Sequence, residues 1–248
     1  MTAVDLSGAY NVRDLGGLKA KDGRVTRSGV VYRSDSLDHI TPSDADILFN
    51  QLHIGTIIDL RTKAETQLAG TLFPVPRYRY SVLVEGRLGK EPFPSDDPIE
   101  LAKVYLQNID TGRAAVKATC EIIARNLGAG VATLFHCAAG RDRTGIIAAV
   151  LLGLVGVTDG QIAMDYVQSN RNARRVTKRL AENPLYANHE DRPAVILLNE
   201  KTIIGFMRLL RDTYGGPRQF CLDSGVTQEI ISTIENGFLR DESGASAA

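Results

Sequence analysis

Residues 136–145, His-Cys-Ala-Ala-Gly-Arg-Asp-Arg-Thr-Gly, constrain the fold most, because they join an apolar strand-like run to an apolar helix-like run. The run before them is Val131–Phe135, and the run after them is Ile146–Val155. A strand that turns directly into a helix gathers several backbone N–H groups in one concavity, which suits a tetrahedral oxyanion. We therefore expect an α/β fold with a phosphate-binding loop between a central strand and a helix.

The side chains of this loop suit nucleophilic chemistry on phosphorus. Cys137 lies where the loop dipoles converge, and a positive field of this kind favours the thiolate, which is the nucleophilic form. Arg143 offers a planar guanidinium that can bind two phosphate oxygens at once. Thr144 follows it, and we expect its hydroxyl to donate to the Cys137 sulfur. The same groups would thus bind a phosphate and activate the thiol.

The loop resembles the H-C-x-x-G-x-x-R-[ST]-G signature of cysteine-dependent protein tyrosine phosphatases. Its basic-Asp-Arg ending is similar to that of a bacterial branch of tyrosine and dual-specificity phosphatases, of which some also act on phosphoinositides. The resemblance extends from about Asn11 to near Leu239. Three other stretches support it, namely Asn11–Gly17 (N-x-R-D-L-G-G), Tyr32-Arg33-Ser34, and Asp59-Leu60-Arg61-Thr62 with Glu65.

The resemblance implies a hydrolase that forms a phosphocysteine intermediate and needs no cofactor. It assigns catalysis to Cys137, Arg143 and Asp142. The phosphate-binding residues that it implies are Ala138, Ala139, Gly140, Arg141, Arg143 and Thr144. The family usually has lysine where this chain has Arg141; the charge is kept, but arginine binds as a fork.

Two carboxylates compete for the role of general acid. The chain has no tryptophan, hence no Trp-Pro-Asp loop of the kind that carries the acid in many tyrosine phosphatases. The resemblance gives the role to Asp142. Asp59, at the end of a predicted strand, is the rival, and Asp59 and Arg61 are secondary site candidates. The structural interpretation of Asp59 is that it pairs with Arg61 or caps a neighbour.

Other functions remain as alternatives. A noncatalytic phosphate-binding module needs the loop but no nucleophile. A sulfur-transfer enzyme of the rhodanese type also cradles a cysteine, but it requires neither His136 nor the Arg-Thr-Gly exit. Cys120 and Cys221 have no basic loop around them, so we interpret them as small buried apolar residues.

Composition limits the domain organisation, the partners and the cellular compartment that the protein can have. The 248 residues contain no low-complexity linker, so we expect a single domain over 1–248. Equal numbers of basic and acidic residues, 29 each, argue against a nucleic-acid partner. Three cysteines without paired spacing favour a reducing compartment, taken as the cytoplasm, and four scattered histidines predict no metal site. The longest apolar run, Ile146–Val157, is shorter than the roughly 20 residues of a membrane span.

Periodicity and capping signals predict the remaining elements. Asp22-Gly23 predicts a hairpin turn leading to a strand at Val30–Tyr32, and Thr158 with Gln161 predicts a capping box. A second strand is expected at Gly55–Leu60. Helices are expected at Asp44–Gln51, Ile99–Ile109, Arg113–Asn126, from Thr158 toward Asn170, at Ile203–Tyr214 and at Val226–Leu239. Alternating strands and helices predict a largely parallel sheet with helices on both faces.

Several features lie outside the loop. Arg13 and Asp14 favour an ion pair that fixes the Gly16-Gly17 turn, and Val84–Pro98 is typical of a surface loop. Residues 171–198 correspond to a helical lid in the resembled family, and residues 242–248 are expected to be disordered. One helical face would carry Arg171, Arg174, Arg175, Lys178 and Arg179. This basic stripe is either a solvated face or a dock for an anionic partner, such as a phosphoinositide-bearing membrane surface or an acidic phosphopeptide.

Overall fold

The computed structural model describes residues 2–68, 79–81, 97–182 and 197–242. Its main sheet has the strand order β1-β3-β6-β4-β5, in which β3, β6, β4 and β5 run parallel and β1 is antiparallel to β3. The strands are β1 (Arg13–Asp14), β3 (Val31–Ser34), β4 (Ile54–Asp59), β5 (Arg79–Ser81) and β6 (Ala132–His136). A second sheet pairs β2 (Val25–Thr26) with β7 (Leu239–Arg240). The predicted strand before the loop is thus the central strand.

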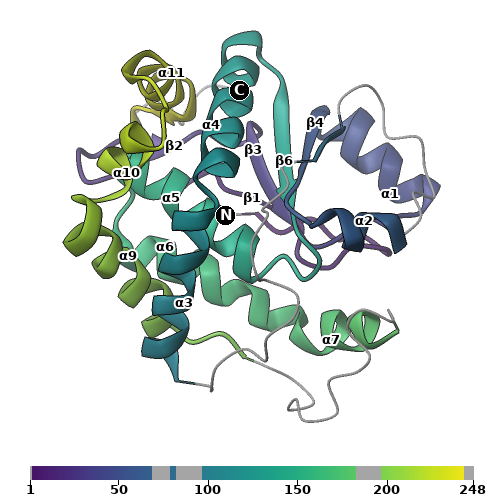
Figure 1. Cartoon of the computed structure of the whole chain (residues 1–248). Helices are drawn as coiled ribbons and strands as arrows, with labels where there is room; N and C mark the ends of the chain where they lie inside the picture. The colour runs from purple at the N-terminus through teal and green to yellow at the C-terminus, as the bar shows by residue number, and fades with distance from the viewer. Residues whose placement is uncertain (1, 69–78, 82–96, 183–196, 243–248) are drawn as a thin grey trace.

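Helices cover both faces of this sheet, as the alternation of strands and helices predicts (Figure 1). The first helix, α1, continues into a π-helical turn, η1, and the sixth helix, α6, continues into a 3₁₀ turn, η2. In chain order the elements are α1 (Pro42–Asp46), η1 (Ile47–Gln51), α2 (Lys63–Leu68), α3 (Pro98–Thr111), α4 (Arg113–Ala129), α5 (Asp142–Leu154), α6 (Asp159–Gln168), η2 (Ser169–Asn172), α7 (Ala173–Ala181), α9 (Glu200–Tyr214), α10 (Pro217–Asp223) and α11 (Gln228–Phe238).

Alternating side chains of β6 divide the core in two. Leu134 packs with Tyr32, Ile57 and Leu48 on the side of α1, whereas Phe135 packs on the opposite side with α5 and the helices around it. Both side chains are fully buried. Because successive residues of a strand face opposite sides, β6 anchors both layers and holds the loop that follows it between them.

The loop after β6 therefore leaves the middle of the sheet and enters α5. That helix is apolar on all sides, and ten of its thirteen residues are buried. A helix without a polar face is buried and packs against other parts of the protein on every side. The start of α5, which carries Asp142 and Arg143, is consequently held rigidly beside the sheet.

Three local predictions need correction. The Asp22-Gly23 turn does form, but it returns the chain to β2 rather than to β3, since the Ala20 N–H bonds the Arg24 carbonyl. Thr158 precedes α6 without a side-chain cap, and the Gln161 oxygen instead accepts from the Lys19 N–H. The helix expected to end at Leu239 ends at Phe238 and gives way to β7. Helix α10, which begins at Pro217, was not predicted.

The predicted Val84–Pro98 loop lies almost entirely outside the described residues, as do residues 183–196 of the expected lid and residues 243–248 of the tail.

Candidate active site

The parallel strands β3, β6 and β4 end side by side. Ser34 pairs with His136 and His136 with Asp59, so the last residues of the three strands form one row. The segments that follow them must therefore meet at the carboxyl edge of the sheet, where α/β folds bind ligands. Cys137 comes directly after this row.

The carbonyl groups of the loop are held from outside. Each accepts a hydrogen bond from a neighbouring segment: Ala138 from the Ser36 N–H (3.1 Å), Ala139 from Asn11 Nδ2 (2.9 Å) and Gly140 from Arg33 Nη2 (2.9 Å). Within a trans peptide the N–H points away from the C=O, and the described chain has no cis bond. The N–H groups of residues 139–141 consequently face the opposite side, at the N-terminus of α5.

Gly140 has two reasons to be glycine. Its φ is +66°, in the left-handed region, and a Cβ atom there would lie 2.6 Å from the Ser34 oxygen and from the Asp35 nitrogen. Both neighbours are backbone atoms of the turn after β3, so they cannot yield as a flexible side chain would. The loop is thus pressed directly against the adjacent strand.

We expect Gly140→Ala to lose oxyanion binding and to destabilise the protein by more than the roughly 1–3 kcal/mol of a strained φ alone. Gly23→Ala is the matched control, since Gly23 also has a positive φ (+88°) but no atom within 4 Å of its Cβ position. Urea denaturation and titration with tungstate measure the two effects. Equal losses of stability in both variants, with tungstate binding intact, would contradict the close contact.

Cys137 and Thr144 are both buried beneath the loop. The expected hydrogen bond from the Thr144 hydroxyl to the sulfur is not formed, and this hydroxyl has no hydrogen-bond partner among the described residues. Burying a hydroxyl without a hydrogen-bond partner costs free energy. The Thr144 hydroxyl is therefore available to form a hydrogen bond with a ligand atom that enters the loop. His136 Nδ1 lies 3.1 Å from the Cys137 carbonyl. Burial lowers the pKa of His136, and the charge of the nearby Asp59 opposes this shift.

Arg143 is held by a carboxylate. Its Nη1 and Nη2 atoms donate to the two oxygens of Glu65 at 2.7 and 2.6 Å, and Nη1 also donates to the Leu60 carbonyl. Glu65 in turn accepts from the Thr62 N–H at the start of α2. This bidentate pair fixes the plane of the guanidinium. Glu65 was noted in the sequence only as part of a motif, and its role becomes visible from this contact.

The two candidate acids have different surroundings. The Asp142 Oδ1 accepts a hydrogen bond from the Tyr105 hydroxyl at 2.6 Å, at the start of α5. Asp59 accepts three hydrogen bonds from the Arg61 side chain, which confirms the structural interpretation of that residue. Burial opposes ionisation of Asp59, but His136 and Arg61 together hold its pKa well below the usual range. Asp59 therefore carries no proton to donate near neutral pH.

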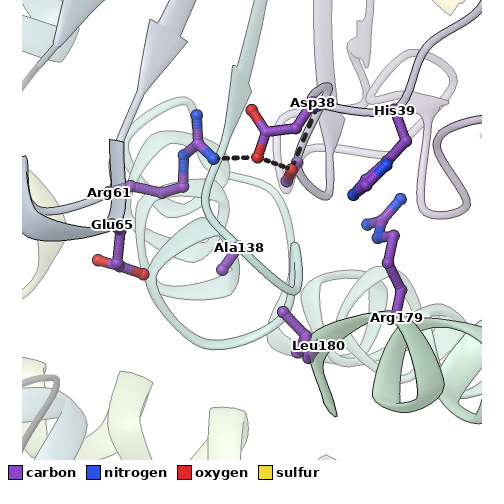
Figure 2. A pocket seen from close by; sticks show the side chains of 8 residues that line it. Asp38, His39, Arg61, Glu65, Ala138, Arg179 and Leu180 are labelled. Carbon is purple, nitrogen blue, oxygen red and sulfur yellow. Dashed lines mark hydrogen bonds and ion pairs between the residues drawn. The ribbon is translucent and has the colours of Figure 1, made fainter. Parts of the chain in front are cut away.

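A pocket opens beside the loop. Figure 2 shows Ala138 at its centre, Arg61 and Glu65 on one side, and His39 and Arg179 on the other. Arg61 forms an ion pair with Asp38 across the pocket wall. The secondary candidate Arg61 thus lines the pocket beside the loop, while Asp59 is buried.

The predicted basic stripe is divided in the structure. Arg179 is buried, where it forms an ion pair with Asp35 and donates to the Gly8 carbonyl. Arg175 is exposed but stacks on the Tyr10 ring at 4.0 Å. Arg171, Arg174 and Lys178 are exposed. The five cations therefore do not form one exposed stripe, since Arg175 and Arg179 anchor α7 to the N-terminal segment.

A buried charge cluster under the loop was also missed. Arg13 pairs with Asp165 at 2.7 Å rather than with Asp14, and Arg33 pairs with the same carboxylate. Asp14 instead accepts from the Gly16 and Gly29 N–H groups, so it does fix the predicted turn. Burial and the charge of Arg13 lower the pKa of Arg33 to about 10, and Asp165 opposes this shift. Arg33 remains a cation at neutral pH while it holds the Gly140 carbonyl.

Cys120 and Cys221 are buried, as predicted, and no cysteine forms a disulfide. A hydrogen bond with Cys221, together with burial, raises the pKa of Cys120 well above its ordinary value. Cys120 is therefore a protonated, inert thiol. Within the described ranges, no helix combines the length and the apolar character that crossing a membrane would require.

The loop, its cysteine and the arginine paired with Glu65 form the candidate site, and comparison with known proteins identifies the family. A model of the tyrosine phosphatase family matches residues 4–240. This chain belongs to that family, whose members are hydrolases of phosphoric monoesters.

Three bacterial relatives carry phosphatase names. PtpB of Mycobacterium tuberculosis, a triple specificity protein phosphatase, is 23% identical over 96% of this chain and 100% of its own length. A Nostoc commune tyrosine-protein phosphatase is 33% identical over 55% of this chain and 47% of its own. A Cupriavidus necator protein, provisionally named a tyrosine-protein phosphatase, is 29% identical over 66% of this chain. The match spans 62% of the Cupriavidus protein's length.

Two solved structures are also similar. The core catalytic domain of the PP-IP phosphatase SIW14 from S. cerevisiae superimposes with a TM-score of 0.37 and 17% identity, over 75% of this chain and 91% of that one. TpbA of P. aeruginosa gives a TM-score of 0.32 and 16% identity, over 68% and 91%. The family assignment rests on the family model and not on these superpositions.

Proposed function

We propose that this chain hydrolyses phosphoric monoesters, as a tyrosine or dual-specificity protein phosphatase, in two steps. The Cys137 thiolate attacks phosphorus, an S–P bond forms, and the bond to the leaving oxygen breaks as Asp142 protonates that oxygen. Water then attacks phosphorus, the S–P bond breaks, and Asp142 takes the proton from water. Inorganic phosphate leaves and the thiolate is restored.

The observation that carries this proposal is the outward anchoring of the carbonyls of Ala138, Ala139 and Gly140. It turns the amide N–H groups of residues 139–141 inward, toward the equatorial oxygens of a bound phosphoryl group. Arg141 and Arg143 add positive charge, and the Thr144 hydroxyl is a further donor. Cys137 begins the same loop, so binding and attack are joined in one segment.

Turnover of p-nitrophenyl phosphate tests the proposal against a noncatalytic phosphate-binding module. The purified chain should release nitrophenolate continuously, and tungstate should inhibit this release competitively. A protein that binds tungstate but releases no nitrophenolate would be a binding module.

Phosphoinositides are a second candidate substrate, which one observation favours. The C-terminal end of α7 supplies Arg179 and Leu180 to the pocket wall, and the same helix exposes Arg174 and Lys178. Together with Arg171, these cations could hold an anionic membrane surface next to the loop. Contact with a membrane would then be peripheral.

We expect Arg171→Gln, Arg174→Gln and Lys178→Gln, combined, to raise the apparent KM for phosphoinositide vesicles by roughly a hundredfold, because each cation near such a surface contributes about 1 kcal/mol. Hydrolysis of p-nitrophenyl phosphate should not change. Added salt should imitate the substitutions, since exposed charges are screened within about 8 Å at physiological ionic strength.

The control variant removes three exposed cations elsewhere, Lys21, Lys117 and Arg125, and keeps the same net charge as the test variant. Arg175 is left in place because it stacks on Tyr10. If both variants hydrolyse vesicles as the wild type does, the exposed cations of α7 are only a solvated face, and a phosphoprotein substrate is favoured.

We also propose that residues 1–248 form one domain in a reducing compartment such as the cytoplasm. The family model covers 4–240, and pairing of β2 with β7 joins the N-terminal part of this range to its C-terminal end. A thiolate nucleophile requires reducing conditions to remain active.

A further inference from the structure

Two buried tyrosines form a hydrogen-bond chain to the carboxylate of Asp142, which acts in both steps of the proposed mechanism. The Tyr105 hydroxyl of α3 lies 2.6 Å from Asp142 Oδ1, and the Tyr166 hydroxyl of α6 lies 2.7 Å from that of Tyr105. Both side chains are almost completely buried, at 0% and 1% exposure. Neither tyrosine belongs to one of the predicted motifs.

The direction of this hydrogen-bond chain follows from counting protons. Burial, followed by the charge of Asp142, raises the pKa of both phenols, so each keeps one proton near neutral pH. The Tyr105 hydroxyl donates a hydrogen bond to Asp142 Oδ1, and its oxygen can then accept a hydrogen bond from the Tyr166 hydroxyl. The hydrogen-bond chain therefore ends on Oδ1 of the Asp142 carboxylate.

Packing holds the two rings in place. They meet edge to face, with centroids 6.3 Å apart, and Tyr105 makes a similar contact with Phe206 of α9. Tyr166 also lies against Gly145, where a Cβ atom would be 3.0 Å from the ring. The chain is thus fixed both to the surrounding helices and to the first turn of α5, which carries Asp142.

We propose that Tyr105, supported by Tyr166, is the positioning residue of the general acid. This inference rests on the proposed function of Asp142. Because Oδ1 is engaged by Tyr105, the proton delivered to the leaving oxygen resides on Oδ2. In the second step the same Oδ2 receives the proton of water. Tyr105 touches neither the substrate nor the reacting atoms.

Tyr105→Phe tests this role through leaving-group and pH dependence. For an alkyl phosphate, whose leaving oxygen needs a proton, kcat should fall about tenfold, the equivalent of one lost hydrogen bond to a charged group. For p-nitrophenyl phosphate the fall should be less than about twofold. The alkaline limb of the alkyl phosphate profile should move to higher pH, since the carboxylate loses a donor that favours its ionised form. Arg33 and Arg141, the cations near Tyr166, are unchanged in the variant.

Two further variants sharpen the test. Tyr166→Phe keeps the bond from Tyr105 to Asp142, so it should show the same pattern with a smaller loss, and it serves as the test if Tyr105→Phe does not fold. Tyr214→Phe is the matched control, because Tyr214 donates to the exposed Asp110 at 2.9 Å, which is also a tyrosine–aspartate bond. Its kcat should equal that of the wild type for both substrates.

The background variant Asp142→Asn separates this inference from the proposed function. If Asp142→Asn lowers kcat for the alkyl phosphate selectively, adding Tyr105→Phe should cause no further selective loss. Equal losses on both substrates in Tyr105→Phe, with an unmoved alkaline limb, would reduce Tyr105 to a packing residue and overturn the inference. If Asp142→Asn itself shows no leaving-group dependence, the proposed role of Asp142 is wrong.

Discussion

Cys137→Ser is expected to lower the turnover of p-nitrophenyl phosphate by more than about 10³-fold, as the loss of a nucleophile does in other covalent enzymes. A serine hydroxyl is not ionised near neutral pH, so it cannot attack phosphorus without a base beside it. Steady-state kinetics of the purified variant measure this loss.

Oxyanion binding should survive in the same variant. In the proposed mechanism the phosphoryl oxygens are bound by the amides of residues 139–141 and the guanidinium of Arg143, and neither depends on the sulfur. Calorimetric titration with tungstate should give a dissociation constant similar to that of the wild type. Cys221→Ser is the control, because Cys221 is buried far along the chain, in α10. A Cys137→Ser variant that keeps a tenth of the wild-type rate would contradict covalent catalysis.

Arg143→Lys is expected to lower kcat by roughly 10²–10³-fold, the range seen when one donor to a developing charge is removed. Lysine keeps the positive charge but is a single point, so it can neither bind two phosphoryl oxygens nor meet both oxygens of Glu65. The loss should be the same for alkyl and nitrophenyl substrates, since the arginine contacts the phosphoryl group and not the leaving oxygen.

Glu65→Ala provides the complementary experiment. It leaves Arg143 intact but removes the two bonds of 2.6 and 2.7 Å that fix its plane. A misplaced catalytic group costs on the order of 10²-fold, so we expect a fall in kcat that approaches that of Arg143→Lys. The double variant should be little worse than Arg143→Lys alone. Additive losses would show that Glu65 acts independently of the arginine.

The part of the site that the sequence could predict is local. A strand, a short loop (137–141) and a helix follow one another, and their apolar patterns differ enough to place Cys137, Asp142 and Arg143 correctly at the end of β6 and the start of α5. The local capping signal was less reliable, since Thr158 and Gln161 predicted a capping box but Thr158 precedes α6 without a side-chain cap.

Partners that are distant in sequence could not be predicted. Arg13 has an acidic neighbour in Asp14, yet its carboxylate is Asp165, because β1 and α6 come together only in the fold. Arg179 looks like one of five equivalent cations, and only the position of Asp35 after β3 explains its burial. Tyr105 gives no signal at all in the sequence, since a tyrosine within an amphipathic helix is typical of an ordinary core residue.

A mass measurement of the reacting enzyme tests covalent catalysis most directly. The protein is mixed with p-nitrophenyl phosphate, denatured within the first turnovers and digested, and the peptide that contains Cys137 is examined. We predict that this peptide gains one phosphoryl group on the sulfur, and that the gain is absent in Cys137→Ser. Full turnover without any phosphorylated Cys137, or with the phosphoryl group on another residue, would contradict the account.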